Sequence, residues 1–194
     1  MVTVSNTGTL NYFIQPVLGL NESLEKFKQR KGFLRSKKDV VKTECVYLPV
    51  YVFKILTEDT KKNIVQHYVC VDAIEGQFAF IDIEKMQKQE GKSGTIGGFL
   101  VAEEEAMITA RSEFRLHLQR FKPGISIVEI YLEATAGYPY WIGYFVSKKG
   151  YSFDVLDACS GKEQGVKMQS LFSKLILQKI QRSDSADLQT NPSL

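Results

Sequence analysis

The fold is decided by residues 137–161, GYPYWIGYFVSKKGYSFDVLDACSG. An aromatic run, a polar break and a second apolar run predict two strands joined by a tight turn, because a polar segment containing glycine reverses the chain. A related pattern occurs at residues 48–76, LPVYVFKILTEDTKKNIVQHYVCVDAIEG. Both segments end in Asp-Ala-x-x-Gly. The chain is therefore predicted to contain two β-hairpins with similar ends.

The two hairpins indicate an internal duplication. The prolines that open them, Pro49 and Pro139, lie 90 positions apart. The aspartates that close them, Asp72 and Asp157, lie 85 positions apart, so the first hairpin loop is five residues longer than the second. A duplication of this kind predicts two structurally similar halves.

Helical periodicity precedes each hairpin. Residues 22–30 and, more clearly, residues 101–121 repeat apolar side chains every three or four positions, and residues 167–182 predict a closing helix. A helix that lies across an antiparallel hairpin buries one face of each. The sequence therefore predicts an α+β fold of two helix-plus-antiparallel-hairpin repeats, with the sheet covered by helices.

The duplication divides the chain into four segments. They are a first α+β repeat with an N-terminal extension (1–84), a linker containing glycine (85–100), a second α+β repeat with the closing helix (101–182) and a flexible tail of low apolar content (183–194). We also expect a separate strand before each hairpin, at residues 40–48 and at residues 125–132.

Composition limits the function only loosely. The chain has 194 residues, 24% of them charged, and a net charge of +3, which by itself does not indicate a nucleic-acid partner. Cys45, Cys70 and Cys159 are odd in number and lie in apolar segments, which favours core thiols in a reducing compartment over disulfides. No secretory signal and no apolar run of about 20 residues is visible. We expect a cytoplasmic protein without a transmembrane segment.

Each half has the same predicted order of elements, a helix, an aromatic strand, a turn and a strand that ends in Asp-Ala-x-x-Gly. The ends are Val71–Gly76 and Leu156–Gly161. This order resembles the PepSY-like family, small helix-over-hairpin domains in which a strand ends in Asp-Ala-x-Thr-Gly. The resemblance covers residues 22–83 and 101–165. It implies a non-catalytic binding or inhibitory module, with the cystatin-like architecture, a curved sheet wrapped on a helix, as the wider alternative.

Asp72 and Asp157 invite two interpretations, a pair of catalytic carboxylates or two turn caps. An aspartate at the end of a strand accepts hydrogen bonds from the N–H groups of the following turn, and a glycine four residues later supplies a positive φ. The turn chemistry accounts for the whole motif, so we predict a structural role for both aspartates.

The histidines and cysteines do not predict a metal or cofactor site. His67 and His117 are the only histidines, and neither has a ligand partner at i, i+4. Cysteine–histidine pairs, Cys70 with His117 or Cys159 with His67, stay open as alternatives, although thiols buried in strands are usually inert. No metal, no cofactor and no catalytic residue is predicted.

Seven positive charges lie within thirteen residues after the first helix begins. Such a segment can bind phosphate backbones or an anionic membrane surface, but a run of charge is more often a solvated face. The residues of this basic patch are Lys26, Lys28, Arg30, Lys31, Arg35, Lys37 and Lys38. Nucleic-acid binding is an alternative that the sequence does not favour.

Tyrosine and tryptophan gather in and beside the two hairpins. Their rings combine an apolar body with a polar tip, which suits recognition surfaces, and packing between the repeats is the competing explanation. The candidate binding residues are Tyr47, Tyr51, Tyr138, Tyr140, Trp141 and Tyr144. Both faces of the second hairpin carry rings. We expect one face to pack under the helix at 101–121, and the other to meet the other repeat, a partner subunit or a ligand.

These observations predict a non-enzymatic binding module that recognises a protein or peptide through the aromatic hairpin surface or a strand edge beside it. The partner is another protein, or a second copy of the chain in a homodimer. The alternative is a small-molecule site or enzyme with a pocket between sheet and helix, lined by Tyr140, Trp141 and Tyr144, with Asp157 or Cys159 at its mouth. A concave cavity that holds a titratable group with a shifted pKa would favour this alternative.

Overall fold

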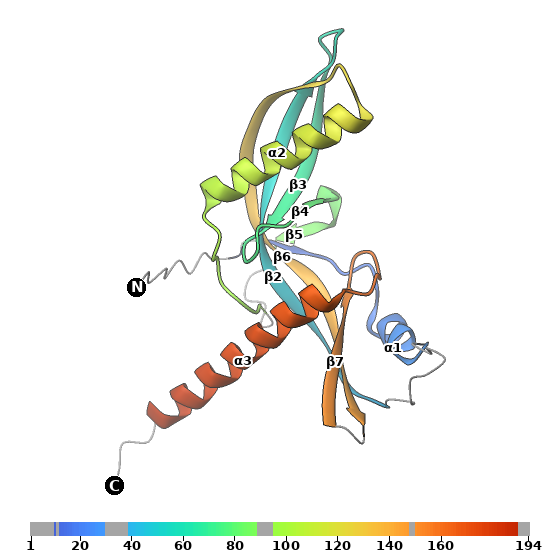
Figure 1. Cartoon of the computed structure of the whole chain (residues 1–194), viewed down its shortest axis with the longest axis vertical. Coiled ribbons are helices and arrows are strands. Elements are labelled where there is room, and N and C mark those ends of the chain that lie inside the picture. The colour runs from blue at the N-terminus through green and yellow to red at the C-terminus, as the bar shows by residue number, and fades with distance from the viewer. Residues whose placement is uncertain (1–9, 11, 30–38, 89–94, 148–149, 190–194) are drawn as a thin grey trace. The chain divides into compact units, whose positions relative to one another are not determined.

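The computed structural model describes residues 10, 12–29, 39–88, 95–147 and 150–189. The elements follow in the order β1 (Tyr12–Ile14), α1 (Leu20–Gln29), β2 (Asp39–Glu58), β3 (Ile64–Asp72), β4 (Phe78–Phe80), η1 (Ile83–Lys85), β5 (Met86–Lys88), α2 (Glu103–Phe121), β6 (Ser126–Ser147), β7 (Gly150–Asp157) and α3 (Val166–Gln189) (Figure 1). The described strands form a seven-stranded sheet with the path β4-β3-β2-β6-β1-β5, and β7 pairs with β6. The sheet is mostly antiparallel, although β1 runs parallel to β6. The predicted α+β class is confirmed. No helix in the described part of the chain is long and apolar enough to cross a membrane.

Both predicted hairpins are present. β2 and β3 pair antiparallel over nine positions, and β6 and β7 pair over eight. Pairing begins one residue after a proline in each hairpin, at Val50 and at Tyr140. The expectation of a separate strand before each proline is wrong, because β2 and β6 run unbroken through Pro49 and Pro139.

The carbonyl groups of the two prolines explain why the strands continue. The N–H of Ala73 donates to the carbonyl of Pro49 at 2.9 Å, and the N–H of Ala158 donates to the carbonyl of Pro139 at 3.2 Å. A proline in a strand loses its donor and keeps its acceptor. Since only the acceptor is used toward the next strand, proline at this position does not interrupt the pairing there.

Packing divides the chain into two compact units that are not contiguous in sequence. Unit 1 comprises Met1–Gln15 and Tyr47–Tyr138, and unit 2 comprises Pro16–Val46 and Pro139–Leu194. The long strands β2 and β6 each contribute residues to both units. These packing units differ from the segments 1–84 and 101–182, which remain predictions about the extent of the repeats.

The core of unit 1 lies between α2 and the first hairpin. The buried side chains of α2 recur every four residues, one helical turn apart, and are Ala106, Ala110, Phe114 and Leu118. They pack in one cluster with inward side chains of β2 and β3, among them the fully buried Phe53 and Val69. The expectation that this helix covers the second hairpin is therefore wrong. Part of the predicted linker also joins this unit, because β5 pairs with β1.

In unit 2, α1 covers one face of the second hairpin. Phe27 packs in one buried cluster with Trp141, Phe145 and Leu156, and the rings of Phe27 and Phe145 meet edge to face at 5.9 Å. Gly143 permits this close approach, since a Cβ added to it would lie 2.8 Å from the ring of Phe27. α1 therefore lies directly on the strand β6 at the position that has no side chain.

The opposite face of the second hairpin is covered by α3. Phe172 of α3 is fully buried, and its ring meets that of Tyr140 edge to face at 5.3 Å. Gln169 donates to the carboxylate of Asp154 on β7 at 3.2 Å. The helix continues to Gln189, beyond the predicted end at residue 182. Two helices, one on each face, thus cover the rings that the sequence analysis left in need of a partner surface.

Candidate functional site

Three of the six predicted binding residues are buried. Tyr47 and Tyr51 belong to the core of unit 1, and Trp141 is 8% exposed in unit 2. Trp141 donates its indole N–H to the carbonyl of Leu18 at 2.7 Å, so its polar tip is satisfied inside the protein. Tyr51 likewise donates its hydroxyl to the carbonyl of Val101 at 3.0 Å. These rings were interpreted either as a recognition surface or as packing, and the structure places these three in the core.

The other three predicted binding residues are partly exposed. They are Tyr138, Tyr140 and Tyr144. Tyr144 donates its hydroxyl to a carboxylate oxygen of Glu44 at 2.6 Å. Burial, and then the hydrogen bond to Glu44, raise the pKa of Tyr144 well above its usual value, so the phenol stays neutral. Two of these rings are held by neighbours inside unit 2, Tyr140 by Phe172 and Tyr144 by Glu44, whereas Tyr138 belongs to unit 1.

The most exposed aromatic side chain of the second hairpin is one that the sequence analysis did not select. Tyr151 is the second residue of β7, and its side chain is 87% exposed. Its cross-strand neighbour Val146 is also exposed, at 38%. The signal available in the sequence was position, because Tyr151 directly follows Gly150 in the polar break that predicts the turn.

The two aspartates cap their turns, as predicted. The carboxylate of Asp72 accepts three backbone N–H groups at 2.6 to 3.0 Å, and that of Asp157 accepts two, at 2.8 and 2.9 Å. Gly76 and Gly161 have φ values of +71° and +67°, which favour a residue without a Cβ. The motif is thus a structural device, and its carboxylates are occupied by their own turns.

The basic patch is described only in part. Lys26 and Lys28 lie in the last turn of α1 and are exposed. The ammonium of Lys26 donates to the carbonyl of Gly161 at 3.0 Å, which ties α1 to the second Asp-Ala turn. The five other members, Arg30, Lys31, Arg35, Lys37 and Lys38, lie outside the described residues.

The pairing of Cys70 with His117 finds no support in the described residues. Cys70 is buried on β3 between Val69 and Val71, which face α2. Since side chains alternate along a strand, its thiol points to the other face of the sheet, away from His117 on α2. Among the residues that the structure describes, no group of three or more His, Cys, Asp or Glu side chains could hold a metal ion.

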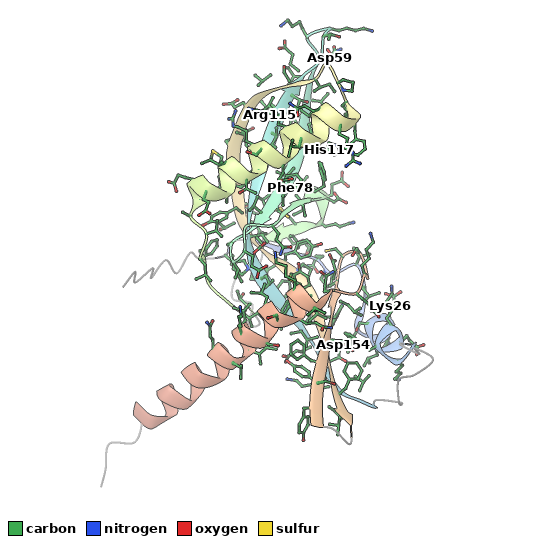
Figure 2. The ribbon with its side chains drawn as sticks, viewed as in Figure 1. Lys26, Asp59, Phe78, Arg115, His117 and Asp154 are labelled. Atoms are coloured by element: carbon green, nitrogen blue, oxygen red, sulfur yellow. The ribbon has the colours of Figure 1, made fainter. Side chains whose placement is uncertain are left out.

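A pocket of about 290 Å³ lies in unit 1 between α2, β3 and β4. Its lining combines three apolar side chains with three that carry or can carry positive charge, and consists of Phe80, Phe114, Leu118, His67, His117 and Lys122. Figure 2 shows His117 on the same helix as Arg115, with Phe78 on the neighbouring strand β4. None of the six lining residues is acidic. The pocket therefore offers an apolar wall beside a cationic one.

His67 is the best-defined polar group of this pocket. Its Nε2 lies 3.0 Å from the hydroxyl oxygen of Thr57, and that hydroxyl donates to the carbonyl of Val65 at 3.3 Å. Which of the two groups donates in the contact between Thr57 and Nε2 follows from the tautomer of His67. Burial, and then the charges of Lys122 and His117, lower the pKa of His67 below its ordinary value. His67 is therefore neutral at pH 7.

The pocket was not predicted from the sequence, because neither histidine has a partner close to it along the chain. Two periodic signals were available. His67 is in phase with Val69 and Val71 on β3, and His117 lies three residues after Phe114 and four before Phe121 on α2. Each histidine therefore belongs to the inward or boundary stripe of its element. Their mutual approach depends on which helix covers which hairpin.

Comparison with known proteins does not identify the chain. No protein-family model matches it, and neither does any curated protein or solved structure. Its function must therefore be inferred from its own geometry.

Proposed function

We propose that this chain is a non-enzymatic binding protein that recognises an extended segment of another protein or peptide by strand addition at β7. In this proposal it consists of two PepSY-like repeats, at residues 1–84 and 101–182, joined by the segment 85–100. The support for the repeats is the equivalence of the two turns, which share the proline carbonyl acceptor, the aspartate cap and the positive-φ glycine.

The order of elements supports the same duplication. α1 precedes β2 and β3 in the chain, and α2 precedes β6 and β7. Within the packing units the helices are exchanged, because α2 covers the hairpin of the first repeat and α1 covers the hairpin of the second. Exchange of an equivalent element between two copies is what a duplicated sequence permits, since both hairpins offer a helix-binding face.

The open edge of β7 carries the functional part of the proposal. Asp157 and Val155 use backbone groups toward residues 162 and 164, away from β6. Backbone groups alternate in direction along a strand, so those of Tyr151 and Phe153 also point away from β6. In the described part of the chain no strand pairs with this side of β7. Unpaired donors and acceptors on a sheet edge are a template for an added strand.

Tyr151 and Val146 supply the side-chain contact next to this edge. They are directly opposite each other in the β6–β7 ladder and are both exposed. An aromatic ring beside an aliphatic side chain gives an added strand an apolar surface to cover. We place the protein in the cytoplasm, because its three cysteines are odd in number and lie in apolar segments, a pattern typical of a reducing compartment. A second copy of the chain would use the same edge.

The test uses the full chain as the target for selecting peptides from a random library. The peptides have seven to ten residues, about the length of a strand. Tyr151→Pro removes one outward N–H, which an edge strand tolerates structurally. We expect this variant to bind the selected peptides at least about tenfold more weakly, at a nearly unchanged melting temperature. Gln66→Pro is the matched control, because residue 66 occupies the equivalent outward phase on β3.

The control separates the two edges. Gln66→Pro should leave peptide binding unchanged. If Tyr151→Pro binds as well as the parent chain, or if Gln66→Pro alone loses binding, strand addition at β7 is wrong. Concentration-dependent dimerisation that Tyr151→Pro abolishes would identify the partner as a second copy of the chain.

A further inference from the structure

We propose that the pocket between α2, β3 and β4 binds a small aromatic or aliphatic carboxylate. This site lies in unit 1, whereas the proposed peptide edge lies in unit 2, so it goes beyond the proposed function and stands independently of it. It also differs from the small-molecule pocket predicted around Tyr140, Trp141 and Tyr144, whose rings are held by unit 2. The ligand class follows from the shape, the rings and the charge of the lining.

The apolar wall of the pocket suits a flat ligand. The ring of Phe80 lies 4.7 Å from that of His117 and 5.9 Å from that of Phe114, and His67 lies 5.1 Å from Phe114. Leu118 is buried and closes the wall on α2. Rings at these distances and inclined to one another leave edges and faces for a further ring or a short aliphatic chain to contact. A volume near the lower end of known ligand sites limits the ligand to a small molecule.

The charge of the lining favours an anion. Lys122 carries a full positive charge, and the two imidazoles are the other polar groups. Glu58, which follows Thr57 on β2, is held at 3.1 Å by Lys62 and is not part of the lining. The carbonyl end of α2 is partly negative, and Lys122 at its C-cap opposes this charge. Among the six lining residues, therefore, no acid competes with a ligand carboxylate for Lys122.

His67 makes binding depend on pH. Lys122 and His117 are the charges that act on His67, and Thr57 on β2 is its hydrogen-bond partner. A carboxylate in the pocket offsets those positive charges and raises the pKa of His67 toward its ordinary value. Binding therefore takes up protons, and by linkage the affinity for a carboxylate increases as the pH falls from about 8 to about 6, where the carboxylate of the ligand is still ionised.

The experiment uses the full chain and three probes of one shape and different charge, namely 3-phenylpropionate, 3-phenylpropanamide and 3-phenylpropylamine. Titration is followed by NMR of the two imidazole side chains and by calorimetry. We expect both imidazoles to shift on addition of the carboxylate. The carboxylate should bind about tenfold more tightly than the amide at pH 7, and the amine most weakly, because a charge-assisted hydrogen bond is the added contact.

Two substitutions test whether Lys122 causes the preference for the carboxylate over the amide. Lys122→Gln should remove most of the difference between carboxylate and amide while leaving amide binding nearly unchanged. Arg115→Gln is the matched control, because Arg115 is an exposed cation on the same helix and does not line the pocket. The comparison of probes is made within one folded protein, so it does not depend on equal stability of the variants.

Three outcomes would overturn the proposal. The first is an amine that binds as tightly as the carboxylate. The second is a preference for the carboxylate that survives Lys122→Gln, or one that Arg115→Gln removes. The third is the absence of any imidazole shift with millimolar 3-phenylpropionate. Tyr151→Pro should not change any of these results, so failure here is distinct from failure of the peptide-binding proposal.

Discussion

The two hairpins close in the same turn and are packed in different ways. The hairpin of unit 1 has α2 on one face, and a pocket with two histidines remains beside that helix. The hairpin of unit 2 has α1 on one face and α3 on the other. The comparison teaches that a local motif determines how a chain turns, whereas the elements that settle on the strands determine whether the surface is filled or leaves a site.

The difference follows from the side chains at the helix–strand contacts. On the second hairpin, Phe27 sits on Gly143, where the missing side chain lets ring and backbone meet. On the first hairpin, α2 presents His117 and Lys122 at its C-terminal end. These polar groups disfavour a filled contact that excludes water. A filled interface contributes stability, and an incompletely filled one leaves room for a ligand.

The largest expected effect concerns the filled hairpin. Trp141→Ala should lower the free energy of unfolding by about 3 to 5 kcal/mol, because it removes a buried ring and the hydrogen bond to Leu18. Chemical denaturation measures this loss, and amide hydrogen exchange should show lower protection in β7 than in β3. A loss below about 1 kcal/mol would mean that the second hairpin is not filled around Trp141.

A smaller loss is expected from adding a single methyl group at the contact between α1 and β6. Gly143→Ala should destabilise the chain by about 1 to 3 kcal/mol, since the new Cβ would lie 2.8 Å from the ring of Phe27. Gly98→Ala is the control, because a Cβ there meets nothing within 4 Å. Equal stability of the two variants in thermal denaturation would contradict the close approach of α1.

The smallest effect is confined to alkaline pH. The folded-state pKa of Tyr144 is raised, so the folded protein holds its phenolic proton at a pH where the unfolded chain, with a pKa near 10, releases it. Stability from this group is present below pH 10 and is lost as the pH rises above that value. Tyr144→Phe should therefore weaken the fall in stability between about pH 9.5 and 11. Identical pH profiles for the parent and the variant would exclude this contribution.

The sequence predicted the local structure well wherever neighbouring residues decide it. Both hairpins, the aspartate caps and the positive-φ glycines follow from residues within a few positions of one another, and all are found. The predicted strand breaks at Pro49 and Pro139 were wrong, because the N–H group that donates to each proline carbonyl belongs to a turn some twenty residues away.

The candidate sites could not be predicted in the same way. Tyr47, Tyr51 and Trp141 have the composition of a recognition surface, yet burial depends on what covers them. His67 and His117 are fifty residues apart and meet only because α2 packs on β3. Periodicity predicted which face of each helix or strand is buried, but it did not predict which other element packs against that face.

The sequence by itself determined the α+β class, the two hairpins and the chemistry of their turns, because these depend on short-range sterics and hydrogen bonds. Only the tertiary structure decided which helix covers which hairpin, since both hairpins present apolar faces that a helix can cover. That choice buries Trp141, leaves the side chain of Tyr151 exposed, and brings two histidines and a lysine around one pocket.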